Sequence, residues 1–194
     1  MEKKEVLSVG MLKLYGLRGM TDKAQASALL ARSAVETWGL HKLPAVVKLA
    51  AGKPVFRGEL ELHFNLSHSG NFALCALSDR PVGVDIEALR PRRDGLAEYI
   101  LSPTELEWYH AQGSTTEALL TLWTRKEALC KYRGTGLTFP VRDITPPLPG
   151  DPAGPPFVRS MSGGGWTASV CAELVATDEI IWFTHNDLKG DTST

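Results

Sequence analysis

The sequence predicts an α+β fold built from two halves of similar plan. Of the 194 residues, 43% are hydrophobic and 22% are charged, which is the composition of a globular chain with a substantial core. Segments with strand and helix signals follow one another as strand, helix, strands, and then as strand, helices, strands. A Ser-Asp-Arg-Pro turn at residues 78–81 separates the two series. We therefore expect an N-terminal half at 1–81, a C-terminal half at 82–184 and a frayed tail at 185–194.

In the first half, apolar alternation and turn or capping signals give the following order: a strand at 6–16, a helix from Thr21-Asp22 to Gly39, an apolar segment at 46–49, a turn at 51–54, and strands at 60–66 and 72–77. Gly16 is expected to end the first strand. The Ser-His-Ser-Gly run that follows residue 66 is expected to connect the last two strands.

The second half continues in this order: a strand at 82–86, a helix from Ser102 to about His110, a longer helix from Ser114 to Gly134, an exposed loop at 146–156, a hairpin at 157–161 and 166–175, and a last strand at 180–183. Each helix begins at a serine followed three residues later by a glutamate, the sequence signature of a capping box. Pro103 suits the first helical position of the shorter helix, and Gly134 is expected to end the longer one.

Charge and cysteine content exclude several classes of protein. A formal net charge of −1 and a pI of about 6.5 do not favour binding to nucleic acid or to an anionic membrane. No apolar run approaches the ~20 residues of a membrane helix, and we expect a cytoplasmic protein. Cys75, Cys130 and Cys171 lie far apart in apolar segments, which predicts small core residues rather than disulfides or zinc ligands.

Two carboxylates lie at positions i and i+2 of the strand predicted at 82–86. The valines and isoleucine of Val-Gly-Val-Asp-Ile-Glu share one face, so Asp85 and Glu87 project from the other, beside Gly83. At about 6–7 Å apart, two such charges repel by about 2–3 kcal/mol. A divalent cation that prefers oxygen ligands, such as Mg²⁺, would relieve this repulsion. A solvated strand edge is the simpler interpretation.

Three charged residues stand out on the helix that ends at Gly134. Glu127 and Lys131 are i, i+4 neighbours on the flank of an apolar arc, a spacing that usually marks an exposed ion pair. Lys126 falls in the middle of that arc. It must therefore extend to solvent or find an anionic partner.

Residues 65–70 collect an amide, hydroxyls, an imidazole and a glycine at a strand end, and Lys53 lies in a Gly-Lys-Pro turn. Such groups can hold a phosphate through side-chain and backbone donors, and a polar turn is the alternative. Ser67 and His68 are adjacent in a strand and therefore point apart, which argues against a serine–histidine nucleophile pair.

Together these segments resemble the surfactin-type 4′-phosphopantetheinyl transferases of the holo-acyl-carrier-protein synthase superfamily. The resemblance covers about residues 27–171. It rests on motifs in the order of the family: Gly-Lys-Pro at 52–54, Phe-Asn-Leu-Ser-His-Ser-Gly at 64–70, Val-Gly-Val-Asp-Ile-Glu at 82–87, a Ser-Pro-Thr-Glu helix start at 102–105, Trp-Thr-Arg-Lys-Glu-Ala-Leu-Cys-Lys-Tyr-Arg-Gly-Thr-Gly-Leu at 123–137, and Ala-Ser-Val-Cys at 168–171.

The resemblance implies an α+β pseudo-dimer of two similar halves in one monomeric chain, with the active site in the cleft between them. It implies Mg²⁺-dependent transfer of the 4′-phosphopantetheine moiety of coenzyme A to a serine of an apo carrier protein, with release of adenosine 3′,5′-bisphosphate. Matching positions assign the site residues as follows: Asp85, Glu87 and Glu127 to Mg²⁺, Lys53, Ser67, His68 and Lys131 to coenzyme A, and Glu127 and Lys131 to catalysis. Glu127 or a water held by the acidic residues is the candidate base, and Lys131 would contact the phosphate under attack. Lys53, Lys131 and Lys126 would offset phosphate charge.

Two features depart from the family pattern. The basic helical segment that usually follows the first strand is reduced to residues 17–20, so part of the expected clamp on the coenzyme A phosphates is missing. Arg18, Lys23 or Arg32 would have to replace it. Residues 99–101 lack the usual arginine–aromatic pair. Weaker coenzyme A binding or an unusual carrier preference would follow.

The arginines Arg90, Arg92 and Arg93 have two interpretations. They either meet the acidic helix of the carrier or form a solvated loop. For the whole chain, the alternative function is a catalytically inactive protein of the same fold that binds coenzyme A or a carrier. A metal-dependent phosphohydrolase on an unrelated fold ranks last, because few further carboxylates and histidines cluster.

Overall fold

A computed structural model describes residues 10–58, 61–137, 140–152, 154–175 and 179–189. Its elements follow in this order: β1 (Leu12–Arg18), α1 (Ala24–Trp38), β2 (Val46–Lys48), β3 (Pro54–Phe56), β4 (His63–Ser69), β5 (Phe72–Ser78), β6 (Val82–Ala88), α2 (Leu96–Ile100), α3 (Pro103–Ala111), α4 (Thr116–Arg133), η1 (Val141–Asp143), β7 (Phe157–Gly163), β8 (Trp166–Ala172), β9 (Ile180–Thr184) and η2 (Asp187–Lys189). The mixed content of strands and helices confirms the predicted α+β class.

In the part of the chain that the structure describes, the strands form three sheets. The first has the order β4-β5-β1-β9, the second is the β2–β3 hairpin, and the third has the order β6-β8-β7. Neighbouring strands are antiparallel except β9, which pairs in parallel with β1. The last strand of the predicted C-terminal half therefore lies in the first sheet, and the domain boundary after residue 81 stays a prediction.

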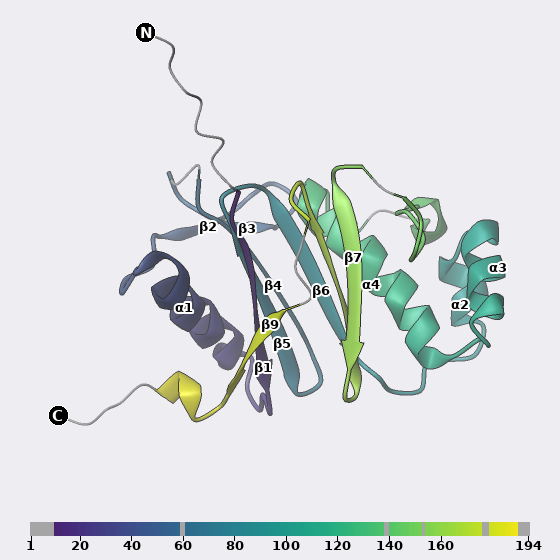
Figure 1. The fold of residues 1–194 in the computed structure, drawn as a ribbon, viewed down its shortest axis with the longest axis horizontal. Helices are drawn as coiled ribbons and strands as arrows, with labels where there is room; N and C mark the ends of the chain where they lie inside the picture. Colours follow the sequence, from purple (N-terminus) through teal and green to yellow (C-terminus); the bar gives the residue numbers. More distant parts are fainter. Residues whose placement is uncertain (1–9, 59–60, 138–139, 153, 176–178, 190–194) are drawn as a thin grey trace, which may run out of the picture.

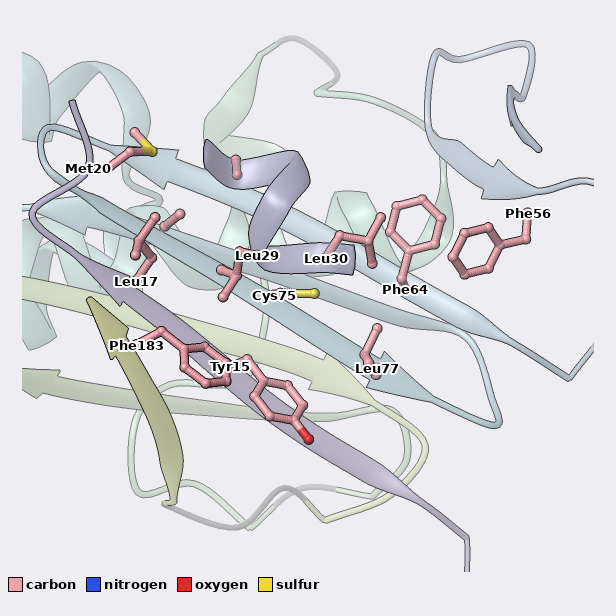
Figure 2. Packing of buried hydrophobic residues seen from close by; sticks show 12 residues of the cluster. Tyr15, Leu17, Met20, Leu29, Leu30, Phe56, Phe64, Cys75, Leu77 and Phe183 are labelled. Carbon is pink, nitrogen blue, oxygen red and sulfur yellow. The ribbon is translucent and has the colours of Figure 1, made fainter. Parts of the chain in front are cut away.

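Within the described residues, four clusters of buried side chains form the core, and one of them joins α2, η1 and α4. In Figure 1, α1 and α4 lie on opposite outer sides of the two larger sheets. Aromatic and aliphatic residues of α1, β1, β5 and β9 fill the layer beneath α1 (Figure 2). A second layer joins the inner faces of the two sheets and contains Val82, Val84 and Ile86, as the alternation predicts. A third packs α4 against β7 and β8.

Gly16 does not end the first strand, because β1 continues to Arg18. The reason is tertiary. A Cβ atom at Gly16 would lie within 2.8 Å of three carbon atoms of the Trp182 ring, so the glycine makes room for a side chain of β9. The part of the predicted strand at residues 6–9 lies outside the described residues.

The predicted strand at 60–66 is shifted to β4, so the Ser-His-Ser run lies inside the strand instead of forming a turn. The hydroxyls of its two serines, Ser67 and Ser69, donate hydrogen bonds to the carboxylates of Asp85 and Glu87 on β6. These partners replace the solvent contacts that a turn would give the serines. The turn that follows is made at Gly70, where φ is +57°.

The longer helix begins one residue later than predicted. Thr115 is the N-cap of α4, and its side chain accepts a hydrogen bond from the Ala118 amide. Ser114 instead has a positive φ of 56° and ends the preceding loop. The capping box at Ser102 and Glu105 is confirmed.

Four short elements were not expected, namely β3, α2, η1 and η2. The five-residue helix α2 is too short to give a helical period in the sequence. In the predicted tail, η2 forms after β9, where the Thr184 amide donates to Asp187 Oδ2 at 2.6 Å. Residues 187–189 are therefore not frayed.

Candidate functional site

Polar side chains from β4, β6 and α4 meet where the first and third sheets approach each other. Ser67 Oγ donates to Asp85 Oδ1 at 2.6 Å, and Lys131 Nζ donates to the same oxygen at 2.7 Å. Lys131 Nζ also lies 3.1 Å from Ser67 Oγ. The structure thus brings together three of the predicted site residues, from positions far apart in the sequence.

The local sequence explains this convergence. Alternation along β6 places Gly83, Asp85 and Glu87 on the face toward α4. The helix comes very close at Gly83, where a Cβ atom would lie 2.2 Å from the Ala128 carbonyl oxygen. The helix thus fills the space beside Gly83, and β6 is not a solvated strand edge at Asp85, whose side chain is only 7% exposed.

Strand β4 contributes through its own alternation. Asn65 Oδ1 accepts a hydrogen bond from the Val84 amide at 2.8 Å, which ties β4 to β6. Ser67 Oγ donates to Asp85 Oδ1 at 2.6 Å, and two residues further along each strand Ser69 Oγ donates to Glu87 Oε2 at 2.7 Å. The side chains of these alternate residues thus connect the two strands.

Glu87 has a second partner that sequence reasoning did not identify. Arg92 Nη2 donates to Glu87 Oε2 at 2.6 Å. The sequence offered this arginine only as part of a carrier-docking surface or a solvated loop. The sequence signal for this contact was that Arg92 follows Glu87 by only five residues, just beyond the end of the strand.

The carboxylates of this cluster affect one another. Burial raises the pKa of Asp85, and the neighbouring Lys131 ammonium opposes that rise. The pKa of Glu127 is raised by burial and then by the charges of Asp85 and Glu87, against the effect of Lys131. Lys131 pairs with Asp85 instead of forming the usual i, i+4 bridge, and within the described residues Glu127 has no ion pair. Negative charge is thus only partly compensated.

The donor set suits a hard divalent cation. Asp85 Oδ2 is buried and has no hydrogen-bond partner among the described residues, although carboxylate oxygens are the ligands that Mg²⁺ prefers. Asp85 Oδ1 forms an ion pair with Lys131, and Glu87 Oε2 forms one with Arg92. In the described part of the chain, no three His, Cys, Asp or Glu side chains are grouped closely enough to hold a metal ion. The residue chemistry fits the ion, and the carboxylates would have to exchange partners to bind it.

The other predicted contacts lie elsewhere. Lys53 Nζ donates to the carbonyl oxygens of Val82 and Tyr132 at 3.0 and 3.3 Å, so it joins the β2–β3 turn to the ends of β6 and α4. It lines a cavity of about 290 Å³ together with Arg133 and apolar residues. His68 is exposed, and strand alternation directs it away from Ser67.

Lys126 found the anionic partner that its position predicted. It is fully buried, and its Nζ donates to Glu105 Oε2 at 2.7 Å and to the Ile144 carbonyl. Its suggested role in offsetting phosphate charge is wrong, because this ammonium is enclosed on the α3 side of α4.

The arginines suggested as substitutes for the missing clamp have other partners. Arg18 lies over the Trp182 ring at 4.3 Å from its centroid, and Arg32 pairs with Glu36 at 2.6 Å.

None of the helices in the described residues has the length and hydropathy of a membrane span.

Comparison with known proteins agrees with this arrangement of motifs. Residues 81–175 match the family model of the 4′-phosphopantetheinyl transferase superfamily. The chain is 34% identical over 152 residues to the 4′-phosphopantetheinyl transferase AcpT of Salmonella typhi, covering 76% of this chain and 79% of the relative. It is 33% identical over 128 residues to a 4′-phosphopantetheinyl transferase of Bacillus subtilis, covering 63% of this chain and 56% of the relative.

These observations define an α+β fold of three sheets with a carboxylate–lysine cluster between β4, β6 and α4. The chain belongs to the 4′-phosphopantetheinyl transferase superfamily. Several relatives are longer, and the matched segment covers between 39% and 56% of the Bacillus subtilis, Bacillus pumilus and Aneurinibacillus migulanus enzymes, about half their length.

Proposed function

We propose that this protein transfers the 4′-phosphopantetheine moiety of coenzyme A to a serine hydroxyl of an apo carrier protein. One observation carries the proposal: Ser67, Asp85 and Lys131, from three different elements, share hydrogen bonds within 3.1 Å beside the carboxylates of Glu87 and Glu127. Hydroxyl, carboxylate and ammonium groups on one surface suit the binding and displacement of a pyrophosphate.

In the proposed reaction, the carrier serine oxygen attacks the phosphorus that bears the pantetheine arm. A new P–O bond forms, and the bond from that phosphorus to the bridging pyrophosphate oxygen breaks. The departing adenosine 3′,5′-bisphosphate keeps the electron pair. The serine proton passes to the Glu127 carboxylate, either directly or through a water.

Each residue has a role that follows from its surroundings. The raised pKa of Glu127 brings this carboxylate closer to the range in which a general base works at neutral pH. The Lys131 ammonium, 27% exposed, can turn from Asp85 to a phosphate oxygen and stabilise developing charge there. Asp85, Glu87 and Glu127 would hold Mg²⁺, which supplies charge neutralisation on the pyrophosphate. Ser67, Lys53 and His68 are proposed coenzyme A contacts.

The architecture of the site supports the proposed pseudo-dimer. Each larger sheet carries one long helix on its outer side, α1 on the first and α4 on the third. The proposed site lies where β4 of one sheet meets β6 of the other. We propose that one cytoplasmic, monomeric chain acts with coenzyme A and an acyl or peptidyl carrier as its partners.

Intact-mass spectrometry of apo carriers tests the transfer. Several carriers are incubated with this protein, coenzyme A and Mg²⁺, in parallel with Glu127→Gln and with Glu117→Gln as the matched control. Glu117 is an exposed glutamate on the same helix. We expect at least one carrier to gain a phosphopantetheine with the wild type and Glu117→Gln, and a loss of about 100-fold or more in rate with Glu127→Gln.

The alternative function, an inactive coenzyme A or carrier-binding protein, gives a different result. No carrier would gain mass, while calorimetry would still record binding of coenzyme A. This alternative needs a test because the segment between β1 and α1 is reduced, and part of the expected clamp on the coenzyme A phosphates is missing. Comparing KM for coenzyme A with KM for 3′-dephospho-coenzyme A measures what remains of the phosphate clamp, because only a retained clamp distinguishes the two substrates.

A further inference from the structure

The loop between β6 and α2 carries a cation onto one of the proposed metal ligands. The side chains of Arg92 and Glu87 are 22% and 19% exposed, and Arg92 Nη2 lies 2.6 Å from Glu87 Oε2. A carboxylate held at this distance by a guanidinium is neutralised by it. An external cation that uses Glu87 has to compete with this contact.

Arg92 is held less completely than a structural arginine of the same fold. Arg125 donates from Nε to the Pro147 carbonyl at 2.9 Å and from Nη1 to Ser160 Oγ at 2.9 Å. Arg92 Nε, in contrast, is buried without a hydrogen-bond partner, and within the described residues Glu87 is its sole partner. A buried unpaired donor is unfavourable, so the present position of Arg92 is easier to leave than that of Arg125.

The residues around Arg92 leave room for a second position of its guanidinium group. It lines a cavity of about 120 Å³ with Glu87 and apolar residues of α2 and α4. It also lines a second cavity, of about 260 Å³, whose wall includes Asp94 and Glu98. A guanidinium displaced from Glu87 would meet carboxylates on that other side. Its loop lies between Pro91 and Gly95, outside any helix or strand.

We infer that Arg92 is an electrostatic latch on the acidic site, which competes with a divalent cation for Glu87 and swings toward Asp94 and Glu98 when that cation binds. This inference rests on the proposed function, since it assigns Glu87 to the metal. It makes Arg92 a positioning residue that sets the cation concentration at which the site fills.

Direct measurement of cation binding tests the latch. Mn²⁺ serves as the probe, because it accepts the same oxygen ligands and its free concentration is measurable by electron paramagnetic resonance. The proteins are the wild type, Arg92→Gln and the neighbouring exposed Arg93→Gln, which removes the same charge without a recorded contact to Glu87. We expect Arg92→Gln to bind Mn²⁺ about fivefold more tightly than the wild type, and Arg93→Gln to change the affinity less than about twofold.

Equal affinities of the two variants would overturn the latch, and so would the absence of Mn²⁺ binding in all three proteins. The transfer assay separates this failure from that of the function. Transfer by the wild type with no specific effect of Arg92→Gln leaves the function intact and removes the latch. Tighter Mn²⁺ binding by Arg92→Gln without any transfer does the reverse.

Chemical modification of the unaltered protein provides a second test that does not depend on a variant. Phenylglyoxal reacts with accessible guanidinium groups, and peptide mass spectrometry measures the extent of modification at each arginine. By reciprocity, if Arg92 hinders the cation, the cation must release Arg92. We expect saturating Mg²⁺ to raise modification of Arg92 about threefold or more, with Arg125 and Arg93 unchanged. An unchanged or lower reactivity of Arg92 would rule out the swing.

Discussion

Gly83 determines how closely α4 can lie against β6. A Cβ atom at this position would lie 2.2 Å from the Ala128 carbonyl oxygen and 2.3 Å from the Tyr132 amide nitrogen, both of them backbone atoms that no rotamer change can move. The resulting contact brings Asp85 within reach of Lys131. The chemistry of the site thus depends on the absence of a side chain two residues away.

We therefore expect Gly83→Ala to lower the free energy of unfolding by about 3 kcal/mol and to weaken transfer, because α4 must shift away from β6. Gly164→Ala is the matched control, since no atom of the described residues lies within 4 Å of a Cβ built there. It should change stability by less than about 0.5 kcal/mol. Urea unfolding of both variants makes the comparison, and similar small losses would show that the helix accommodates a methyl group.

The buried cysteines give a prediction that depends on pH. Burial raises the pKa of Cys171 from its ordinary 9.0 to about 12, and it also raises that of Cys75. We expect neither thiol to react with iodoacetamide at pH 8 in the native protein, and all three cysteines to react in urea. Mass spectrometry after labelling checks this, and native labelling of Cys171 would contradict its burial.

The same shifts fix the sign of a stability change. Because the native thiols bind their protons more tightly than the unfolded thiols do, the stabilisation is fully present below pH 9 and is lost as pH rises toward the native pKa. The melting temperature should therefore fall as the solution becomes more alkaline than about pH 9.

The positions of some single side chains could be predicted from the sequence, but their partners could not. Alternation placed Asp85 and Glu87 on the face opposite the core, and apolar spacing showed that Lys126 needs an anion; both predictions are confirmed. Glu105 could not be predicted as the partner of Lys126, because tertiary structure brings α3 against α4. Arg92 lies only five residues after Glu87, but it belongs to a loop, where no helical or strand period predicts the direction of a side chain. The catalytic and ligand roles stay predictions.

At the level of elements, α4 is held from its far side by a buried ion pair. Lys126 and Glu105 have side-chain exposures of 0% and 3%, with 2.7 Å between Nζ and Oε2. Glu105 Oε2 also accepts from the Ser102 amide, so one carboxylate closes the capping box of α3 and anchors α4. Burial lowers the pKa of Lys126, and Glu105 opposes that effect.

Removing one member of such a pair is more harmful than removing both, because it leaves an uncompensated buried charge. We expect Lys126→Met to lower the free energy of unfolding by about 3–5 kcal/mol, and addition of Glu105→Met to restore part of it. Lys42→Met, at an exposed position, is the control. Urea unfolding of the double-mutant cycle gives the coupling, and strictly additive losses would contradict a direct pair.

The elements missed by sequence reasoning share a physical reason. The end of β4 was placed too early, at residue 66, because Ser67 and Ser69 are typical turn residues and their partners on β6 were not known. The end of β1 was placed at Gly16 because the Trp182 ring that needs this glycine comes from the other end of the sequence. Helix α2, with five residues, is held by packing and not by a periodic pattern.

For the whole molecule, the decisive feature is the shared layer between the two larger sheets. Leu14 and Leu74 of the first sheet pack in one cluster with Val84 and Val170 of the third. The first sheet also takes its edge strand β9 from residues 180–184. The first sheet is therefore not complete within residues 1–81.

A fragment of residues 1–81 should therefore remain unfolded, since it lacks β9 and exposes the apolar face that the third sheet covers. Circular dichroism and proton NMR of the fragment test this against the full chain. The full chain should unfold in one transition that fluorescence and circular dichroism report at the same urea concentration. A cooperatively folded fragment would show that the halves are independent domains.

The parallel pairing of β9 with β1 also has a consequence for synthesis on the ribosome. About 168 residues separate the starts of the two strands, which at about 5–20 residues per second is a delay of roughly 8–34 s. Once β5 has been made, β1 has β5 on one side and an open edge on the other for the rest of that interval, beside the position that Trp182 will occupy. The nascent chain must keep this edge from pairing with other chains until β9 emerges, so β1, the earliest of the described strands to be made, gains its second neighbour only when the latest of them is made.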